Sequence, residues 1–194
     1  GGRQIEVSGR PWIFPSEAQC LLCHTAAAGR ALGLETAQLN RNFTYPQTGR
    51  TANQVVTLDA IGALTPRIIQ PPDELPSMPD PYGEAGTLNE RARAWLHTNC
   101  SHCHRPASPM AVDLDLRYST PLAATGACNA LPQRGNLGIA NALIIAPGEA
   151  ERSVLLERVS RRDTQAMPPL GSAQVDIEGV ALLAAWIDGL TSCD

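Results

Sequence analysis

The chain has 194 residues, of which 43% are hydrophobic, 18% charged and 4% aromatic, enough for one large domain or two small ones. All 15 basic residues are arginine, and the 19 acidic residues give a formal charge of -4, which argues against nucleic-acid binding. No segment approaches the ~18 apolar residues of a membrane span, and no signal peptide opens the chain; we expect the export signal to lie outside this sequence.

Three candidate helices lie in the first half of the chain. Ser16 is positioned to cap a helix that runs through Cys20 and Cys23, and residues 32–40 and 53–64 form the other two candidates. Few alternating β-branched runs are present, so strands should contribute little. Residues 65–86 are rich in proline and lack an apolar pattern, which predicts a linker packed along the surface.

The second half begins with a capping box, Thr-Leu-Asn-Glu at residues 87–90, followed by a helix that reaches Cys100. Loops are predicted to about residue 146, then a short helix over 151–160. Asp176 is positioned to cap a last helix with an apolar stripe.

An internal repeat relates the two halves. Residues 61–64 (Ile-Gly-Ala-Leu) correspond to residues 187–190 (Ile-Asp-Gly-Leu), and each segment stands at the end of a predicted closing helix. Residues 45–49 (Tyr-Pro-Gln-Thr-Gly) likewise align with residues 167–171 (Met-Pro-Pro-Leu-Gly). This pattern predicts that the first half is a shortened copy of the second.

Four of the six cysteines belong to two Cys-x-x-Cys-His motifs, the attachment signature of c-type haem. On one helical turn the two thiols can reach the two vinyl groups on one edge of a porphyrin, while the histidine binds the iron. The predicted attachment and proximal-ligand residues are Cys20, Cys23, His24, Cys100, Cys103 and His104.

Two other interpretations of these cysteines are a four-cysteine zinc site and a redox dithiol. Zinc requires no histidine directly after each pair, and a thioredoxin-like centre would occur once, within a β-α-β pattern that the sequence lacks. Haem attachment is completed outside the cytoplasm, where disulfides are also permitted. The remaining Cys128 and Cys193 are therefore expected to form one disulfide, with two free thiols as the alternative.

The sixth iron ligands are predicted from residues placed like the methionine of a small cytochrome domain. Met167 is the candidate for the second haem, with Met110 as a weaker rival. For the first haem, Tyr45 occupies the repeat-equivalent place, and Met78, His97 or an open iron are the alternatives. A helical turn would direct His102 away from its own haem, so it is expected to be exposed.

Several segments resemble a bacterial di-haem cytochrome c module. The similarity extends from about Trp12 to Cys193 and includes residues 12–20, 23–33, 38–41, 91–100, 103–106, 147–148 and 167–171. Such modules are found at the C-terminus of secreted multidomain redox proteins, often with sugar-dehydrogenase-like β-propeller or carbohydrate-active partners. The resemblance implies two covalently bound haem c groups, with His24, His104 and Met167 as iron ligands.

Motifs and resemblance together predict a mainly α fold, with two small cytochrome c-like haem domains in tandem and long loops. The first haem domain, with a reduced cytochrome c fold, is expected over residues 1–64, the linker over 65–86 and the second domain over 87–194.

The expected function is electron transfer between a redox protein, or a fused dehydrogenase or oxidase domain, and an acceptor. The expected location is the periplasm or the extracellular space, and the expected state a monomer. The alternatives are a di-haem peroxidase-like enzyme and a gas sensor that exchanges a ligand at the first iron.

Overall fold

Two helices of thirteen residues, α4 (Leu88–Cys100) and α6 (Ile177–Gly189), form the centre of the computed structural model, which describes residues 1–110 and 112–194. Both begin where capping residues predict. Thr87 accepts a hydrogen bond from the Glu90 N–H and completes the capping box of α4. Asp176 accepts a hydrogen bond from the Gly179 N–H at the start of α6.

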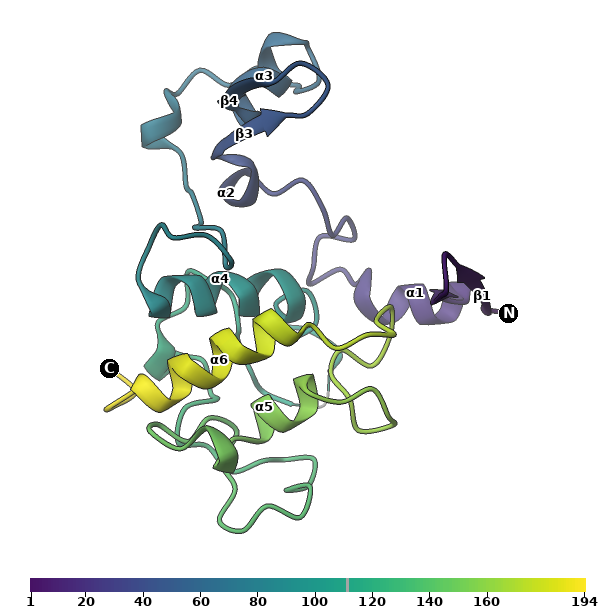
Figure 1. Ribbon diagram of the computed structural model, residues 1–194, viewed down its shortest axis with the longest axis vertical. Helices are drawn as coiled ribbons and strands as arrows, with labels where there is room; N and C mark the ends of the chain where they lie inside the picture. The colour runs from purple at the N-terminus through teal and green to yellow at the C-terminus, as the bar shows by residue number, and fades with distance from the viewer. Residues whose placement is uncertain (111) are drawn as a thin grey trace.

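The hydrophobic core lies between α4, α6 and the shorter α5 (Val154–Val159). These three helices lie side by side in the lower part of Figure 1. Trp186 and Ile187 of α6 are almost fully buried against Trp95 and Leu96 of α4. The 3-10 turns η2 (Leu122–Ala124) and η3 (Ala150–Arg152) belong to the loops around these helices. We call this part, residues 88–194, the body.

The linker is attached to the body by a hydrogen-bonded group of three side chains. Asp176 Oδ2 accepts from Trp95 Nε1 at 2.8 Å and also from the Tyr82 hydroxyl. Burial, followed by the adjacent Asp176 carboxylate, raises the pKa of Tyr82 to about 12. Gly179 leaves room for this group, because a Cβ at that position would overlap Trp95.

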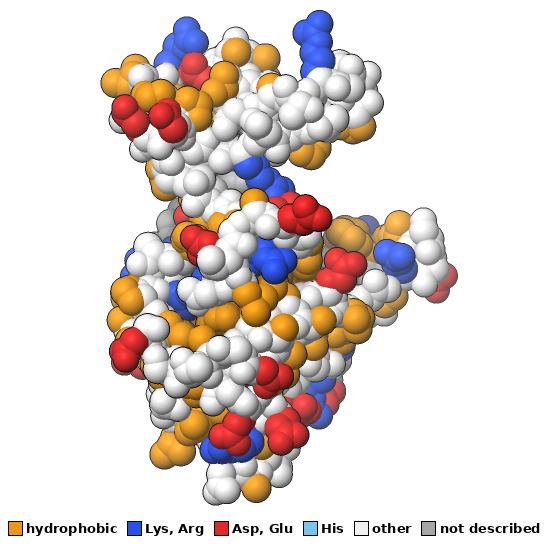
Figure 2. Space-filling model, turned by 60° about the vertical axis from the view of Figure 1, so that its left-hand side comes forward, with side chains coloured by type: hydrophobic (Ala, Val, Ile, Leu, Met, Phe, Trp, Pro, Cys, Tyr) orange, Lys and Arg blue, Asp and Glu red, His pale blue; other side chains and the backbone are white. Residues whose placement is uncertain are grey.

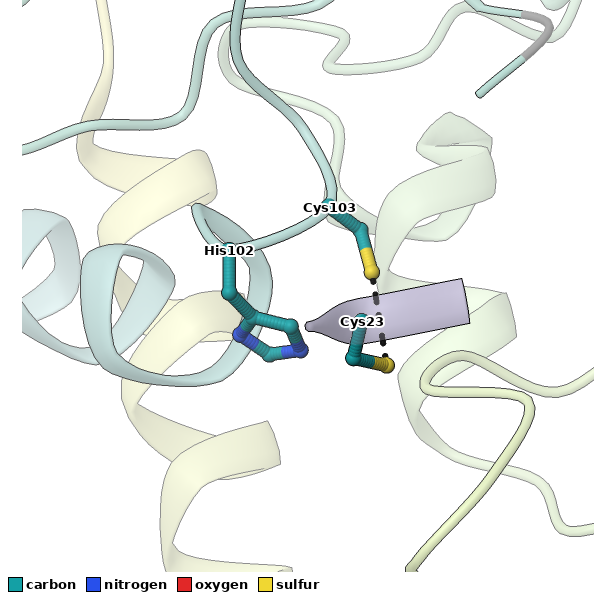
Figure 3. Close-up of side chains that lie close together, drawn as sticks. All are labelled: Cys23, His102 and Cys103. Carbon is teal, nitrogen blue, oxygen red and sulfur yellow. Dashed lines mark hydrogen bonds between the residues drawn. The ribbon is translucent and has the colours of Figure 1, made fainter. Parts of the chain in front are cut away.

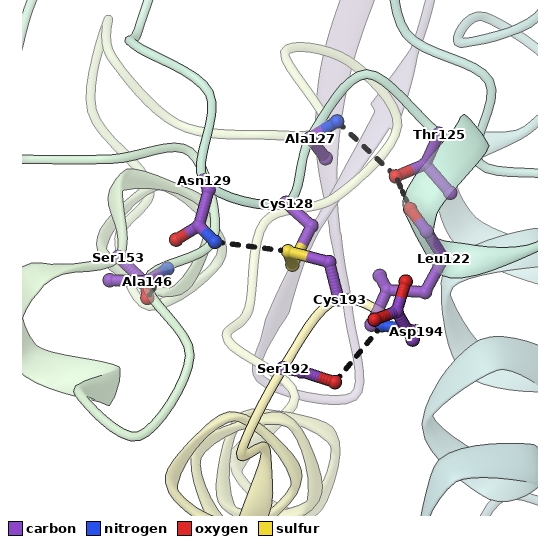
Figure 4. Close-up of a disulfide and its surroundings, with 10 residues drawn as sticks. All are labelled: Leu122, Thr125, Ala127, Cys128, Asn129, Ala146, Ser153, Ser192, Cys193 and Asp194. Carbon is purple, nitrogen blue, oxygen red and sulfur yellow. Dashed lines mark hydrogen bonds between the residues drawn. A yellow bond between two sulfur atoms is a disulfide. The ribbon is translucent and has the colours of Figure 1, made fainter.

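A disulfide closes the loops of the body onto its C-terminus. Cys128 and Cys193 are bonded, the pairing expected from the two cysteines outside the motifs. Figure 4 shows the bond next to Asn129, whose Nδ2 donates to Cys193 Sγ at 3.2 Å. The bridge joins residues 65 positions apart and therefore restrains much of the body in the unfolded chain.

The first residues form an arm that projects from the body (Figure 1). Strands β1 (Arg3–Val7) and β2 (Arg10–Phe14) make an antiparallel hairpin, and α1 (Glu17–Cys23) follows. Ser8 and Gly9 both have positive φ, the geometry of the tight turns that match strand twist. Ser16 completes a capping box with Gln19 at the start of α1, as predicted.

A second lobe stands above the body in Figures 1 and 2. It consists of α2 (Thr36–Leu39), the antiparallel hairpin of β3 (Asn42–Tyr45) and β4 (Arg50–Asn53), and α3 (Gln54–Ala60). Hydrogen bonds of Asn40 join this lobe to the linker: its buried amide donates to the carbonyls of Pro72, Leu75 and Pro76. The Asn40 side-chain oxygen accepts from Asn53 within the lobe. The 3-10 turn η1 (Pro72–Glu74) lies in this linker.

The predicted fold class is wrong. The described residues contain six α-helices that, with the 3-10 turns, make up 31% of the chain, and two small two-stranded antiparallel sheets, and do not form two tandem cytochrome c-like domains. The reason is visible in burial, since Thr25, Asn40 and Val55 are the only buried residues before position 78. With so little apolar surface removed from water, the first half forms hairpins and short helices without a core of its own.

The shortened-copy prediction fails for the same reason. Ile61 is 72% exposed, whereas its counterpart Ile187 is fully buried. Tyr45 ends a strand, whereas its counterpart Met167 lies in an irregular loop. The domain boundaries at residues 64 and 86 stay a prediction. Among the described helices, none has the length and apolar character needed to cross a membrane.

Candidate functional site

The second Cys-x-x-Cys-His motif forms one turn at the end of α4. Cys100 is the last residue of the helix, and the N–H groups of Cys103 and His104 donate to the Cys100 carbonyl at 3.1 and 2.8 Å. The turn therefore brings the first thiol and the imidazole of the motif to the same end of the helix.

Cys100 and His104 line an apolar cavity together with Met167. The cavity has two adjoining parts of about 90 and 210 Å³, both partly open to solvent and both lined mainly by apolar atoms. Met167 lines both parts, and its backbone N–H donates to the Arg158 carbonyl at 2.9 Å. The aliphatic lining of the first part consists of Val112, Leu114, Leu116, Ile144, Val154, Leu155 and Val159.

Burial sets the protonation of Cys100 and His104. Burial lowers the pKa of His104, so its imidazole is neutral, the form that binds a metal. The buried Nδ1 atom of His104 has no hydrogen-bond partner among the described residues. Burial raises the pKa of the Cys100 thiol to about 12, which keeps it from acting as a free thiolate.

The first motif has the same turn in a more open setting. The His24 N–H donates to the Cys20 carbonyl at 2.9 Å, and the side chain is exposed. His24 Nδ1 lies 2.6 Å from the Arg30 carbonyl oxygen. Because a carbonyl only accepts, Nδ1 carries the hydrogen of this contact, and Nε2 is the ring nitrogen that a metal could bind in the neutral form of the ring.

The candidate sixth ligands of the first haem, Tyr45 and Met78, lie outside α1, which precedes His24. Tyr45 lies in the β3–β4 hairpin, where it packs edge-on against Phe43, and this lobe is separate from α1 in Figure 1. Met78 is buried under the same lobe, with its N–H on the Ala37 carbonyl. Tyr45 and Met78 stay predictions.

His97 has a structural role instead. Its Nε2 lies 2.6 Å from Glu35 Oε2, and its Nδ1 accepts from the Tyr118 N–H at 2.9 Å. Both ring nitrogens are therefore engaged, and the buried ring connects α4 to the segment before α2.

His102 is half-buried, not exposed as expected, because the first motif packs over it. Its ring faces Cys23 and Cys103, and the ligand atoms of the three residues lie within 4.8 Å of one another (Figure 3). Burial, followed by the positive charge of Arg105, lowers the pKa of His102. The first motif and the second are thus in direct contact.

Two arginines at the cavity were not singled out from the sequence. Arg134 and Arg158 line the first part of the cavity. Arg158 also donates to the carbonyls of Arg134 and Gln165 at 2.7 and 2.9 Å. Their cationic groups are suited to carboxylates of a bound molecule. No sequence signal separates them from the other arginines, because only folding brings residues 134 and 158 to residue 104.

Met110, the rival of Met167, lines the second part of the cavity, near His102.

Comparisons with known proteins provide no family or fold assignment. No protein-family model, no curated protein and no solved structure matches the chain.

Proposed function

We propose that the chain is a di-haem c-type electron-transfer module. The observation that carries this proposal is the grouping of Cys100, His104 and Met167 around one apolar cavity. A covalently held haem would supply reversible one-electron oxidation and reduction at its iron. Its partners would be a redox protein, or a fused dehydrogenase or oxidase domain, and an acceptor outside the cytoplasm.

The residues of the second site have separate tasks in this proposal. Cys100 and Cys103 would attach the haem as thioethers, by addition of each S–H across a vinyl double bond, which needs no oxidant and releases nothing. Neutral His104 and the thioether of Met167 would hold the iron. Arg134 and Arg158 would pair with the carboxylates of the bound group.

The two irons should differ in reduction potential. His104 lies at an apolar cavity, whereas His24 is exposed on the arm. Burial tunes haem potentials, and the histidines of the two motifs differ in burial. A redox titration that resolves two steps would support this assignment, and two indistinguishable potentials would contradict it.

A second candidate, a peroxidase-like activity at the first iron, rests on one observation. Tyr45 lies in a lobe apart from α1, so the sixth position of the first iron has no ligand assigned from a neighbouring element. An iron that is open on one side can bind peroxide.

The test is a haem count and an electron paramagnetic resonance spectrum of the oxidised protein, exported with haem-attachment machinery. Two haems per chain are expected, with Met167→Ala converting one low-spin signal to high-spin and Met110→Ala as the matched control. A high-spin signal in the unmodified protein, with peroxide turnover, would favour the second candidate. A chain without haem would refute both.

A further inference from the structure

The two haem-attachment motifs meet at their second cysteines. Cys103 Sγ lies 3.6 Å from Cys23 Sγ and 3.9 Å from the Leu22 carbonyl oxygen. Figure 3 shows both side chains pointing toward each other, with the ring of His102 beside them. The two residues are 80 positions apart, so this contact is a product of the tertiary fold.

The approach of the motifs rests on more than one pair of atoms. Arg105, directly after the second motif, donates to the Ala27 carbonyl at 3.4 Å, and Glu35 contacts His97 of α4 at 2.6 Å. Cys23 also lines the second part of the cavity, together with His104 and Met167. The first motif therefore forms one wall of the second site.

A metal ion at Cys23, His102 and Cys103 is the other chemistry that this cluster allows. It would take one cysteine from each Cys-x-x-Cys-His motif and leave Cys20 and Cys100 unused. It would also give no role to His24, whose Nε2 could bind a metal, or to His104 beside Met167. Two haems use all six motif residues, so the haem interpretation accounts for more of the site.

We propose that Cys23 and Cys103 hold the two haems edge to edge, so that the pair exchanges electrons directly within one chain. This inference rests on the proposed di-haem function. In a thioether linkage a single vinyl carbon would separate each sulfur from its porphyrin, so a 3.6 Å gap between the sulfurs would bring the two porphyrin edges close together. Corresponding cysteines of the two motifs face each other, and no intervening side chain is required to connect the haems.

The experiment is Soret circular dichroism of the haem-loaded protein, because two adjacent chromophores give a signal with a positive and a negative lobe. Cys23→Ala leaves Cys20 and His24 to hold the first haem but removes the attachment at the contact. Cys20→Ala is the matched control, since it removes the thioether of the same haem on the exposed side of α1. We expect the two-lobed signal in the unmodified protein, its loss in Cys23→Ala and its retention in Cys20→Ala.

Each other outcome counts against the inference in a distinct way. Two haems per chain with a single-signed Soret band in the unmodified protein would overturn the edge-to-edge pair and leave the electron-transfer function intact. Equal losses in Cys23→Ala and Cys20→Ala would overturn the role of the contact. One haem per chain would also overturn the pair. No haem, with zinc bound instead, would refute the proposed function itself. If Cys23→Ala fails to load haem, Cys103→Ala with Cys100→Ala as control repeats the comparison.

Discussion

The two Cys-x-x-Cys-His motifs share a backbone hydrogen bond and differ in their surroundings. In each, the histidine N–H donates to the carbonyl of the first cysteine, at 2.9 Å for His24 and 2.8 Å for His104. Each motif also lies at the C-terminal end of a helix with a complete capping box. Yet α1 has no buried residue, whereas α4 buries six, Trp95 and Leu96 among them. Local hydrogen bonds thus specify the motif turn, and tertiary packing specifies how far it is buried.

The difference between the two regions is one of stabilising forces. The body has a shared apolar core and a disulfide, whereas the arm and the upper lobe rely on hairpin pairing and on the hydrogen bonds of Asn40. Regions with few buried apolar contacts open at lower free energy than a core. Variants that affect one region and have a matched partner in the other test this comparison.

The largest expected effect comes from the two isoleucines that the internal repeat aligned. Ile187→Ala should lower the free energy of unfolding of the body by about 2–5 kcal/mol, because it empties a fully buried site. Ile61→Ala should change it by less than about 0.5 kcal/mol, because that side chain is 72% exposed. Chemical denaturation followed by far-UV circular dichroism measures both, and similar losses would contradict the assigned core.

Removal of the disulfide should have the next largest effect. Replacing Cys128 and Cys193 with serine should lower the stability of the body by about 2–4 kcal/mol, because the bridge restrains a long loop in the unfolded chain. Amide exchange in the arm should stay as it is. Denaturation midpoints of the variant and of the oxidised protein provide the measurement, and equal midpoints would show that the bridge adds no stability.

Acid should weaken the body through Asp115, whose segment follows the second motif. Hydrogen bonds from the Arg117 guanidinium lower the pKa of Asp115 to about 2. A pKa below the ordinary value of 3.8 means that the ionised group stabilises the fold above about pH 4, and that this contribution is lost as the pH falls toward 2.

Asp115→Asn should therefore destabilise the body by about 1–2 kcal/mol at pH 7, a value reduced because Arg117 is partly solvated. The difference from the unmodified protein should disappear near pH 2. Asp163→Asn is the control, since its pair with Arg161 is on the surface and should contribute little. Urea denaturation at both pH values tests this, and a constant difference between them would contradict it.

The smallest expected effect on stability comes from variants of the two capping boxes. Thr87→Ala should lower the stability of the body by about 1 kcal/mol, because α4 belongs to its core. Ser16→Ala should leave the body unchanged and speed amide exchange only in α1. Hydrogen exchange with mass spectrometry resolves both regions; faster exchange throughout the body after Ser16→Ala would show that the arm is part of one cooperative unit.

The sequence by itself determined the features that depend on neighbouring residues. The starts of α1, α4 and α6 were predicted from Ser16, Thr87 and Asp176, because a capping side chain bonds to N–H groups within three residues. Helix lengths were less predictable: residues 32–40 contain only the four-residue α2, and α3 ends at Ala60 rather than near residue 64. The strands of the first half were missed, since their hairpin turns outweighed a weak apolar pattern.

Only the tertiary structure decided which matching segments would be buried and which distant residues would meet. Ile61 and Ile187 have similar local sequences, but only Ile187 has α4 to pack against. The contact of Cys23 with Cys103, and the position of Arg134 and Arg158 at the His104 cavity, join residues from separate parts of the chain. Such contacts depend on the sum of many packing and loop-closure free energies, which a local pattern does not contain.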